Sequence, residues 1–172
     1  MKWLGFVIVG VAILVLIVVG AALPQRHVAT LRARIQTPRE QVWGAITDVA
    51  AFPGWRAGVD SVELLPASAG PGRWIERGRD GDITYERVEA SPPDRLVVRI
   101  ADEHLPFGGT WTYDLADGGA ATLVTITEDG IVRNPVFRFM SRFIFGHHAT
   151  LDAYLRSLGR HFGQDVDPER VP

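Results

Sequence analysis

One carboxylate in the sequence is placed where it could transfer a proton. The segment VTITE alternates apolar and polar residues, so an extended strand puts Val124, Ile126 and Glu128 on one face. If the two aliphatic residues face the core, Glu128 points inward near the end of its strand and could act as a general base or a polar anchor. The alternative is a partly solvated carboxylate that pairs with Arg133 or Arg138.

Two adjacent histidines follow in an apolar, helical segment. His147 lies on the apolar stripe, where it is either a buried structural histidine or a donor to a ligand carbonyl, and it is the second candidate for acid or base catalysis. His148 and Asp152 share a helical face, but one helix supplies only two ligands, so we expect no metal site. The sequence contains no G-x-S-x-G, P-loop, dinucleotide-binding or H-E-x-x-H motif, and we expect no cofactor.

The elements that position these residues can be predicted from periodicity and turn signals. Residues 28–36 alternate as a half-buried strand, and two short helices are expected between residues 38 and 55. Asn134 and Pro135 are typical of a helix start, and an apolar stripe predicts one long helix from there to residue 162. Between these helices the turn signals separate six further strands, at residues 59–65, 73–77, 83–90, 95–101, 110–115 and 121–128. Such spacing favours an antiparallel sheet of about seven strands that buries the long helix against one face.

This order of elements resembles that of the SRPBCC superfamily, also called START-like or helix-grip, and most closely its polyketide cyclase/dehydrase-like branch. The resemblance spans about residues 28–162 and rests on the strings TPREQVWGAITDVAAFPGW (37–55), TLVTITEDG (122–130) and NPVFRFMSRFIFGHHATLDAYLRSL (134–158). It implies an α+β helix-grip fold, in which a curved sheet wraps around the last helix and encloses an apolar cavity for lipids, sterols, quinones, polyketides or hormones.

Aromatic residues are candidates to line the implied cavity. The last helix carries more aromatic residues than one buried face can hold, so some of them could contact a ligand, with core packing as the alternative for each. The candidate ligand-binding residues are Trp55, Trp74, Tyr85, Trp111, Tyr113, Glu128, Phe139, Met140, Phe143 and His147.

We therefore predict a domain that binds a hydrophobic small molecule or lipid in an internal cavity. One alternative is an enzyme of the cyclase/dehydrase type that uses Glu128 or His147, and a second is a co-chaperone-like or accessory module that binds a protein partner. The first two require free space between the sheet and the last helix, and an interior filled by side chains would argue against both. A net charge of −2 gives no basic surface for nucleic acid, and the absence of Cys excludes disulfides and thiolate chemistry.

The N-terminal segment predicts attachment to a membrane. Residues 3–23 are an unbroken run of 21 uncharged, mostly apolar residues, long enough as a helix to cross a bilayer. We expect an anchor over residues 1–24, with a cleaved signal peptide as the alternative, then a START-like domain over 25–163 and a flexible tail over 164–172. The expected location is the bacterial inner membrane, with the soluble domain on the exported side, although Arg26 and the basic residues after it favour the opposite orientation.

Overall fold

A computed structural model describes residues 2–70, 72–146 and 148–171. His147, one of the two predicted acid/base residues, lies outside the described residues. The elements in chain order are α1 (Lys2–Ala22), β1 (Arg26–Ile35), α2 (Arg39–Thr47), the 3₁₀ helix η1 (Val49–Gly54), β2 (Val59–Leu64), η2 (Ala67–Ala69), β3 (Arg73–Gly78), β4 (Gly81–Ser91), β5 (Arg95–Ile100), β6 (Phe107–Asp117), β7 (Thr122–Val132), α3 (Pro135–Met140), the π-helical η3 (Ser141–Phe145), α4 (Ala149–His161) and β8 (Glu169–Arg170).

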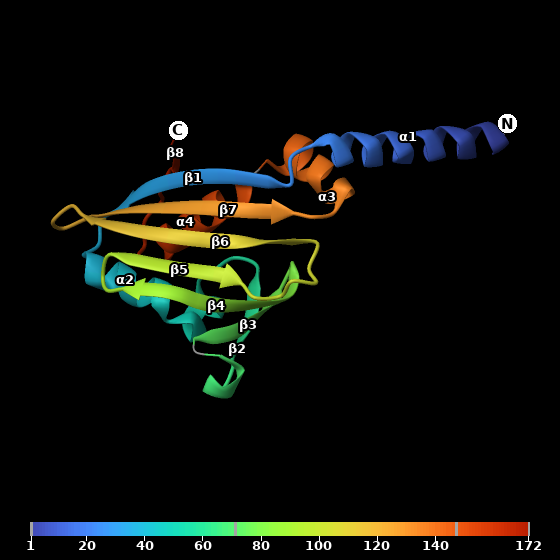
Figure 1. The fold of residues 1–172 in the computed structure, drawn as a ribbon. Helices are drawn as coiled ribbons and strands as arrows, with labels where there is room; N and C mark the ends of the chain where they lie inside the picture. Colours follow the sequence, from blue (N-terminus) through green and yellow to red (C-terminus); the bar gives the residue numbers. More distant parts are fainter. Residues whose placement is uncertain (1, 71, 147, 172) are drawn as a thin grey trace.

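The strands form a single antiparallel sheet in the order β2-β3-β4-β5-β6-β7-β1-β8 (Figure 1). The predicted α+β helix-grip architecture is confirmed, and so are the two short helices after the first strand, which are α2 and η1. The sheet has eight strands where about seven were predicted. The additional strand is β8, whose two residues pair with Leu31 and Arg32 of β1.

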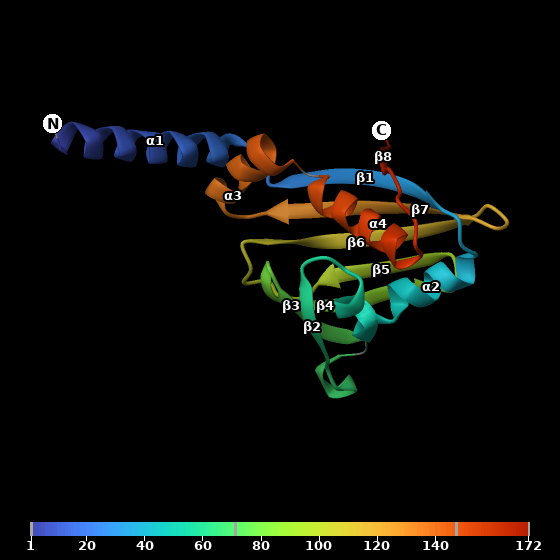
Figure 2. The same cartoon turned by 180° about the vertical axis from the view of Figure 1, so that it is seen from behind.

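The core lies between one face of the sheet and the helices α2, η1 and α4, which Figure 2 shows on the same side. Alternation along β1 buries Ala29, Leu31, Ala33 and Ile35 on that face, as the sequence pattern predicted. The facing stripe of α4 is formed by the fully buried residues Leu151, Leu155 and Leu158. Each such leucine contributes about 1.5–3 kcal/mol through its removal from water, which holds α4 against the sheet.

The predicted single helix over residues 134–162 is wrong, because the chain breaks at Gly146. The start is as predicted: the Asn134 side chain accepts hydrogen bonds from the backbone N–H groups of Val136 and Phe137, at 2.9 and 3.2 Å. The helix then changes to π geometry in η3 and ends at Gly146, whose φ of +73° lies in the left-handed region that glycine adopts without strain. Of residues 134–162, the part that packs under the sheet is therefore α4, while α3 lies at the end of α1 (Figure 1).

Helix α1 extends away from the sheet and touches the domain at its C-terminal end (Figure 1). Gly20 packs directly on Pro135, because a Cβ at this glycine would lie 2.0 Å from the Pro135 carbonyl oxygen. Nearby, the buried Arg138 donates from Nη1 to the Leu23 carbonyl at 2.8 Å, so α3 is fastened to the end of α1. Within the ranges that the structure describes, no helix is both long and apolar enough to cross a membrane.

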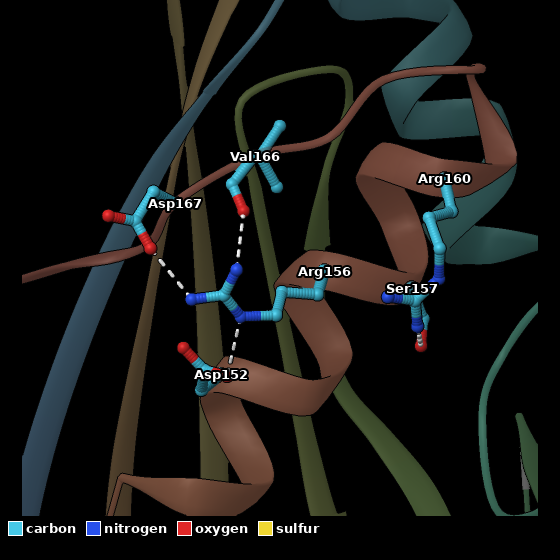
Figure 3. A network of polar contacts seen from close by, with 6 residues as sticks. All are labelled: Asp152, Arg156, Ser157, Arg160, Val166 and Asp167. Atoms are coloured by element: carbon cyan, nitrogen blue, oxygen red, sulfur yellow. Dashed lines mark hydrogen bonds and ion pairs between the residues drawn. The ribbon is translucent and has the colours of Figure 1, made fainter.

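The segment after α4, predicted as a flexible tail, runs back to the edge of the sheet. Arg156 of α4 donates to Asp152 at 2.8 Å, to the Val166 carbonyl at 3.1 Å and to Asp167 at 2.7 Å (Figure 3). Val166 is buried against Gly159, where a Cβ would come within 2.7 Å of the valine side chain. These contacts position β8 beside β1.

Candidate functional site

A buried ion pair lies between η1 and the sheet. Nη1 of Arg56 donates to both carboxylate oxygens of Glu76, at 2.7 and 2.8 Å, and only 14% and 7% of the two side chains are exposed. Strand β3 positions Glu76 on the inner face together with Trp74, two residues earlier, whose indole Nε1 donates to the same carboxylate at 3.0 Å. Arg56 follows η1, and its backbone N–H donates to the Phe52 carbonyl. The interior therefore contains a fixed cation with a fixed counterion.

The guanidinium group of Arg56 also contacts aromatic faces. It lies 5.3 Å from the ring centroid of Phe52 and 5.1 Å from that of Tyr154, which are cation–π distances. Burial is the largest single effect and would lower the pKa of Arg56, but the Glu76 carboxylate and the three nearby tyrosines together raise that pKa above its ordinary value. Arg56 is therefore charged at every pH at which the protein is folded.

All three tyrosines of the chain, Tyr85, Tyr113 and Tyr154, belong to this cluster. Burial raises the pKa of Tyr85 and of Tyr154 to about 12 and raises that of Tyr113 well above its ordinary value. The three phenols are therefore neutral hydrogen-bond donors at physiological pH.

The hydroxyl of Tyr154 is buried and has no hydrogen-bond partner among the described residues. The ring of Tyr113 lies 5.5 Å away, and the two hydroxyls influence each other's titration, but they do not meet the distance and angle of a hydrogen bond. An unsatisfied buried hydroxyl costs about 1–3 kcal/mol, so this one requires an explanation.

The enclosed cavity at this cluster has a volume of about 20 Å³. That is room for one water molecule, whereas sites for organic ligands have volumes of about 300–1,000 Å³. The wide apolar cavity implied by the family resemblance is thus closed by the protein's own side chains. This conformation therefore argues against both ligand binding and cyclisation, and either function requires the interior to open. The cavity is lined by Ile46, Thr47, Val49, Phe52, Arg56, Trp74, Glu76, Tyr85, Arg87, Leu96, Val98, Trp111 and Tyr113.

A larger hollow of about 720 Å³ lies elsewhere, between β1 and the C-terminal segment. Most of its lining residues are polar or charged, and Arg32 at its rim pairs with Glu169 at 3.1 Å. It has neither the aromatic lining nor the buried charges of the site beside η1, so it does not compete with that site as a place for an apolar ligand.

Five of the predicted ligand-binding residues come together at the buried ion pair. Three of their rings contact Tyr154, which lies 5.5 Å from Trp55, 5.7 Å from Trp111 and 5.5 Å from Tyr113. Trp74 and Tyr85 stack at 5.7 Å on neighbouring strands. The five residues are Trp55, Trp74, Tyr85, Trp111 and Tyr113.

Glu128 faces inward and lies opposite Trp111 in the register of β6 and β7. Its carboxylate pairs with His27 of β1, with Oε1 and Nε2 separated by 3.3 Å, and the two side chains are 20% and 14% exposed. Arg133 and Arg138, the partners considered from sequence, bind backbone carbonyls instead. The structure thus contains a histidine–carboxylate pair next to the aromatic cluster.

Three further predicted residues lie away from the cavity. Phe139 and Met140 belong to α3 and Phe143 to η3, so the break at Gly146 separates them from the part of the chain under the sheet. The rings of Phe139 and Phe143 are 4.8 Å apart, and Phe143 is 59% exposed.

Sequence reasoning missed the three residues Arg56, Glu76 and Tyr154. Two signals pointed to them: Glu76 shares strand parity with Trp74, and Tyr154 lies three residues after Leu151 on the buried helical stripe. Nothing local marks Arg56, because its partner is 20 residues away and meets it only in the folded protein.

Comparison with known proteins gives a consistent fold. The family described as "Polyketide cyclase / dehydrase and lipid transport" matches residues 26–162. A conserved protein from Geobacillus kaustophilus is similar in structure, with a TM-score of 0.68 at 16% identity over 83% of this chain and 99% of that one. A START superfamily protein from Mycobacterium smegmatis has a TM-score of 0.63 at 13% identity over 78% of this chain and 96% of that one. The ZhuI aromatase/cyclase from Streptomyces sp. R1128 has a TM-score of 0.63 at 14% identity over 79% and 93%, respectively. No curated protein matches the sequence significantly.

Proposed function

Because this chain belongs to the polyketide cyclase/dehydrase and lipid transport family, we propose that it binds a small hydrophobic molecule between the sheet and α4 and promotes its cyclisation or dehydration. The observation that carries this proposal is the unpartnered hydroxyl of Tyr154 beside the buried cation of Arg56. Together they offer two hydrogen-bond donors to one oxygen atom of a ligand.

The energetics of the cluster support a functional origin. A buried ion pair is often no more stabilising than apolar side chains of the same volume, because both charges lose their hydration. An unsatisfied hydroxyl adds a further cost. Both costs are offset when a ligand oxygen accepts from Arg56 and Tyr154.

The chemistry that this arrangement favours is stabilisation of negative charge on oxygen. Ring closure by carbon–carbon bond formation and the loss of water that follows both pass through an enolate. A guanidinium and a neutral phenol that are fixed in a dry interior stabilise that charge without having to reorganise. Glu76 holds Arg56 in place, and the pair of Glu128 and His27 supplies a nearby base for the carbon-bound proton.

The sharpest test is the removal of one hydroxyl. Tyr154→Phe keeps the ring contacts and deletes only the unpartnered group. We expect the variant to be as stable as the wild type or slightly more stable, and to bind a planar aromatic ketone such as dihydroxyanthraquinone about tenfold less tightly. Quenching of tryptophan fluorescence of the full chain in detergent measures the binding.

Arginine variants provide the matched comparison. Arg56→Met should also weaken binding, whereas Arg79→Met, at a residue whose side chain is 77% exposed, should not. The proposal is wrong if the wild type does not bind the probe, or if Tyr154→Phe binds it as tightly as the wild type does.

We also propose that residues 3–23 hold the domain at a membrane, from which it takes its hydrophobic ligand. The support is the exposure of large apolar side chains around α1, including Phe6 at 76%, Leu14 at 60% and Val18 at 59%. Retention of the full chain in the membrane pellet after alkaline washing tests this anchor. A mature protein that begins after residue 20 would instead establish a cleaved signal peptide, and reporter fusions would assign the side of the inner membrane.

A further inference from the structure

The short helix α3 and the π-helical turn η3 carry apolar side chains that the domain does not cover. Phe137 is 48% exposed, Val136 41% and Phe143 59%, although large apolar residues are ordinarily buried. The π geometry of η3 and the break at Gly146 keep this segment out of the sheet. Its apolar surface is therefore available to contact a molecule or a membrane outside the domain.

The position of this segment is fixed relative to α1. Gly20 allows backbone contact with Pro135, and Arg138 donates to the Leu23 carbonyl. Val136 and Phe137 directly follow Pro135 and so lie level with the last turn of α1. If α1 is embedded in a bilayer, this is the depth of the polar headgroups, where aromatic side chains are enriched.

The chain segments that form α1, α3 and η3 carry basic residues and no acidic ones. The nearest acidic residues of a neighbouring loop are Asp102 and Glu103, beside Pro106, whose carbonyl accepts from the backbone N–H groups of Arg133 and Asn134. No acidic residue precedes Glu40 in the chain, and none lies between Asp129 and Asp152. Arg26, at the start of β1, and Arg142, on η3, are exposed. Exposed arginines next to exposed phenylalanines are typical of a surface that binds anionic lipid headgroups.

We propose that α3 and η3 form a membrane-contact surface, made of Val136, Phe137, Arg142 and Phe143, that lies on an anionic phospholipid bilayer. This inference rests on the anchor proposed for residues 3–23, and it adds the orientation of the domain. The surface holds the end of the sheet where β1 begins, and with it the pair of His27 and Glu128, next to the bilayer.

The absence of cysteine from the chain allows a direct test. Single cysteines replace Phe137 and Phe143, and a control replaces Val88 on β4, which is 55% exposed. Each full-length variant is labelled with an environment-sensitive fluorophore. It is then reconstituted into vesicles of phosphatidylcholine alone or of phosphatidylcholine mixed with phosphatidylglycerol.

We expect quenchers on the lipid acyl chains to reduce the emission of labels at positions 137 and 143, and aqueous iodide to reduce that of the label at position 88. The effect at 137 and 143 should be stronger in vesicles that contain phosphatidylglycerol. Arg142→Gln should lower the ratio of molecules whose contact surface lies in the bilayer to molecules whose contact surface is free in water. The expected change is about fivefold, which is the contribution of one basic residue near an anionic membrane.

Failure of this inference differs from failure of the anchor. A chain that does not float with the vesicles overturns both proposals. A chain that floats while its labels at 137 and 143 stay open to iodide overturns the contact surface alone. Labels that are already shielded in detergent, with no change on reconstitution, would indicate that a second copy covers the surface and would also overturn it.

Discussion

Removal of one partner from the buried ion pair should destabilise the domain far more than removal of both. Glu76→Leu leaves the guanidinium of Arg56 in an apolar interior without its counterion. Breaking a buried pair in this way costs about 3–5 kcal/mol, whereas apolar residues at both positions are often neutral or stabilising. At about 2–4 °C per kcal/mol, the single variant should melt about 6–20 °C below the wild type.

The double variant Arg56→Met/Glu76→Leu should therefore recover most of the lost stability while losing affinity for the ligand. Urea denaturation of the full chain in detergent, followed by tryptophan fluorescence, measures the free energy of unfolding, since Trp74 binds the carboxylate directly. Glu63, which pairs with Arg77 at 2.6 Å on the surface, is the matched control. Glu63→Leu should cost less than about 1 kcal/mol.

Two results would refute this reasoning. A cost below about 1 kcal/mol for Glu76→Leu would mean that water reaches Arg56 and screens its charge. A double variant as unstable as the sum of the two single variants would mean that Arg56 and Glu76 do not interact energetically, and the reasoning from a buried charge left without its counterion would then be lost.

Three other predictions follow from contacts described above. Burial raises the pKa of Tyr85 and Tyr154 to about 12, so the unfolded chain loses its phenolic protons at a lower pH than the folded protein does. The free energy of unfolding should therefore be unaffected up to pH 10 and fall as the pH rises to about 12. Near-ultraviolet absorbance should detect no phenolate near pH 10 while the protein is folded. Gly20→Leu places a side chain where the Pro135 carbonyl lies, so α1 and α3 should separate, and cross-linking between them should be lost while the domain stays folded. Arg156→Met removes three hydrogen bonds to Asp152, Val166 and Asp167, so amide hydrogen exchange should accelerate in the C-terminal segment and not in β7.

Local patterns were sufficient to predict the sheet and its inner face. Period-two alternation correctly predicted the buried residues of β1 and the inward Val124 and Ile126 of β7, because each strand buries one face. The residue Asn134 marked the start of α3, since its side chain satisfies backbone donors that the helix leaves free. The strand β8 could not be predicted, because two residues carry no periodicity.

The helix break and the ion pair required information that a single segment does not contain. Gly146 lies within an apolar stripe that continues on both sides, so the pattern indicated one helix, and only the packing of α3 on α1 favours a turn there. Arg56 lies in the turn after η1 and Glu76 on β3, and their pairing depends on the register of the whole sheet. Sequence reasoning therefore found the aromatic walls of the site and missed its charges.

Because the interior is closed, ligand binding must include the free energy of opening it, and a variant of Trp55 can measure that free energy. A cavity of about 20 Å³ must expand before it accepts an organic molecule, and Trp55 is only half-buried, with ring contacts to Phe52, Tyr154 and His161. Breaking three such contacts costs about 2–4 kcal/mol, which leaves an open state populated at about 0.1–3%. The apparent affinity is reduced to that fraction of the affinity of the open state. Trp55→Ala removes this cost in advance, so it should bind the anthraquinone probe at least tenfold more tightly. Weaker binding by this variant would mean that Trp55 contacts the ligand and that another element opens the site.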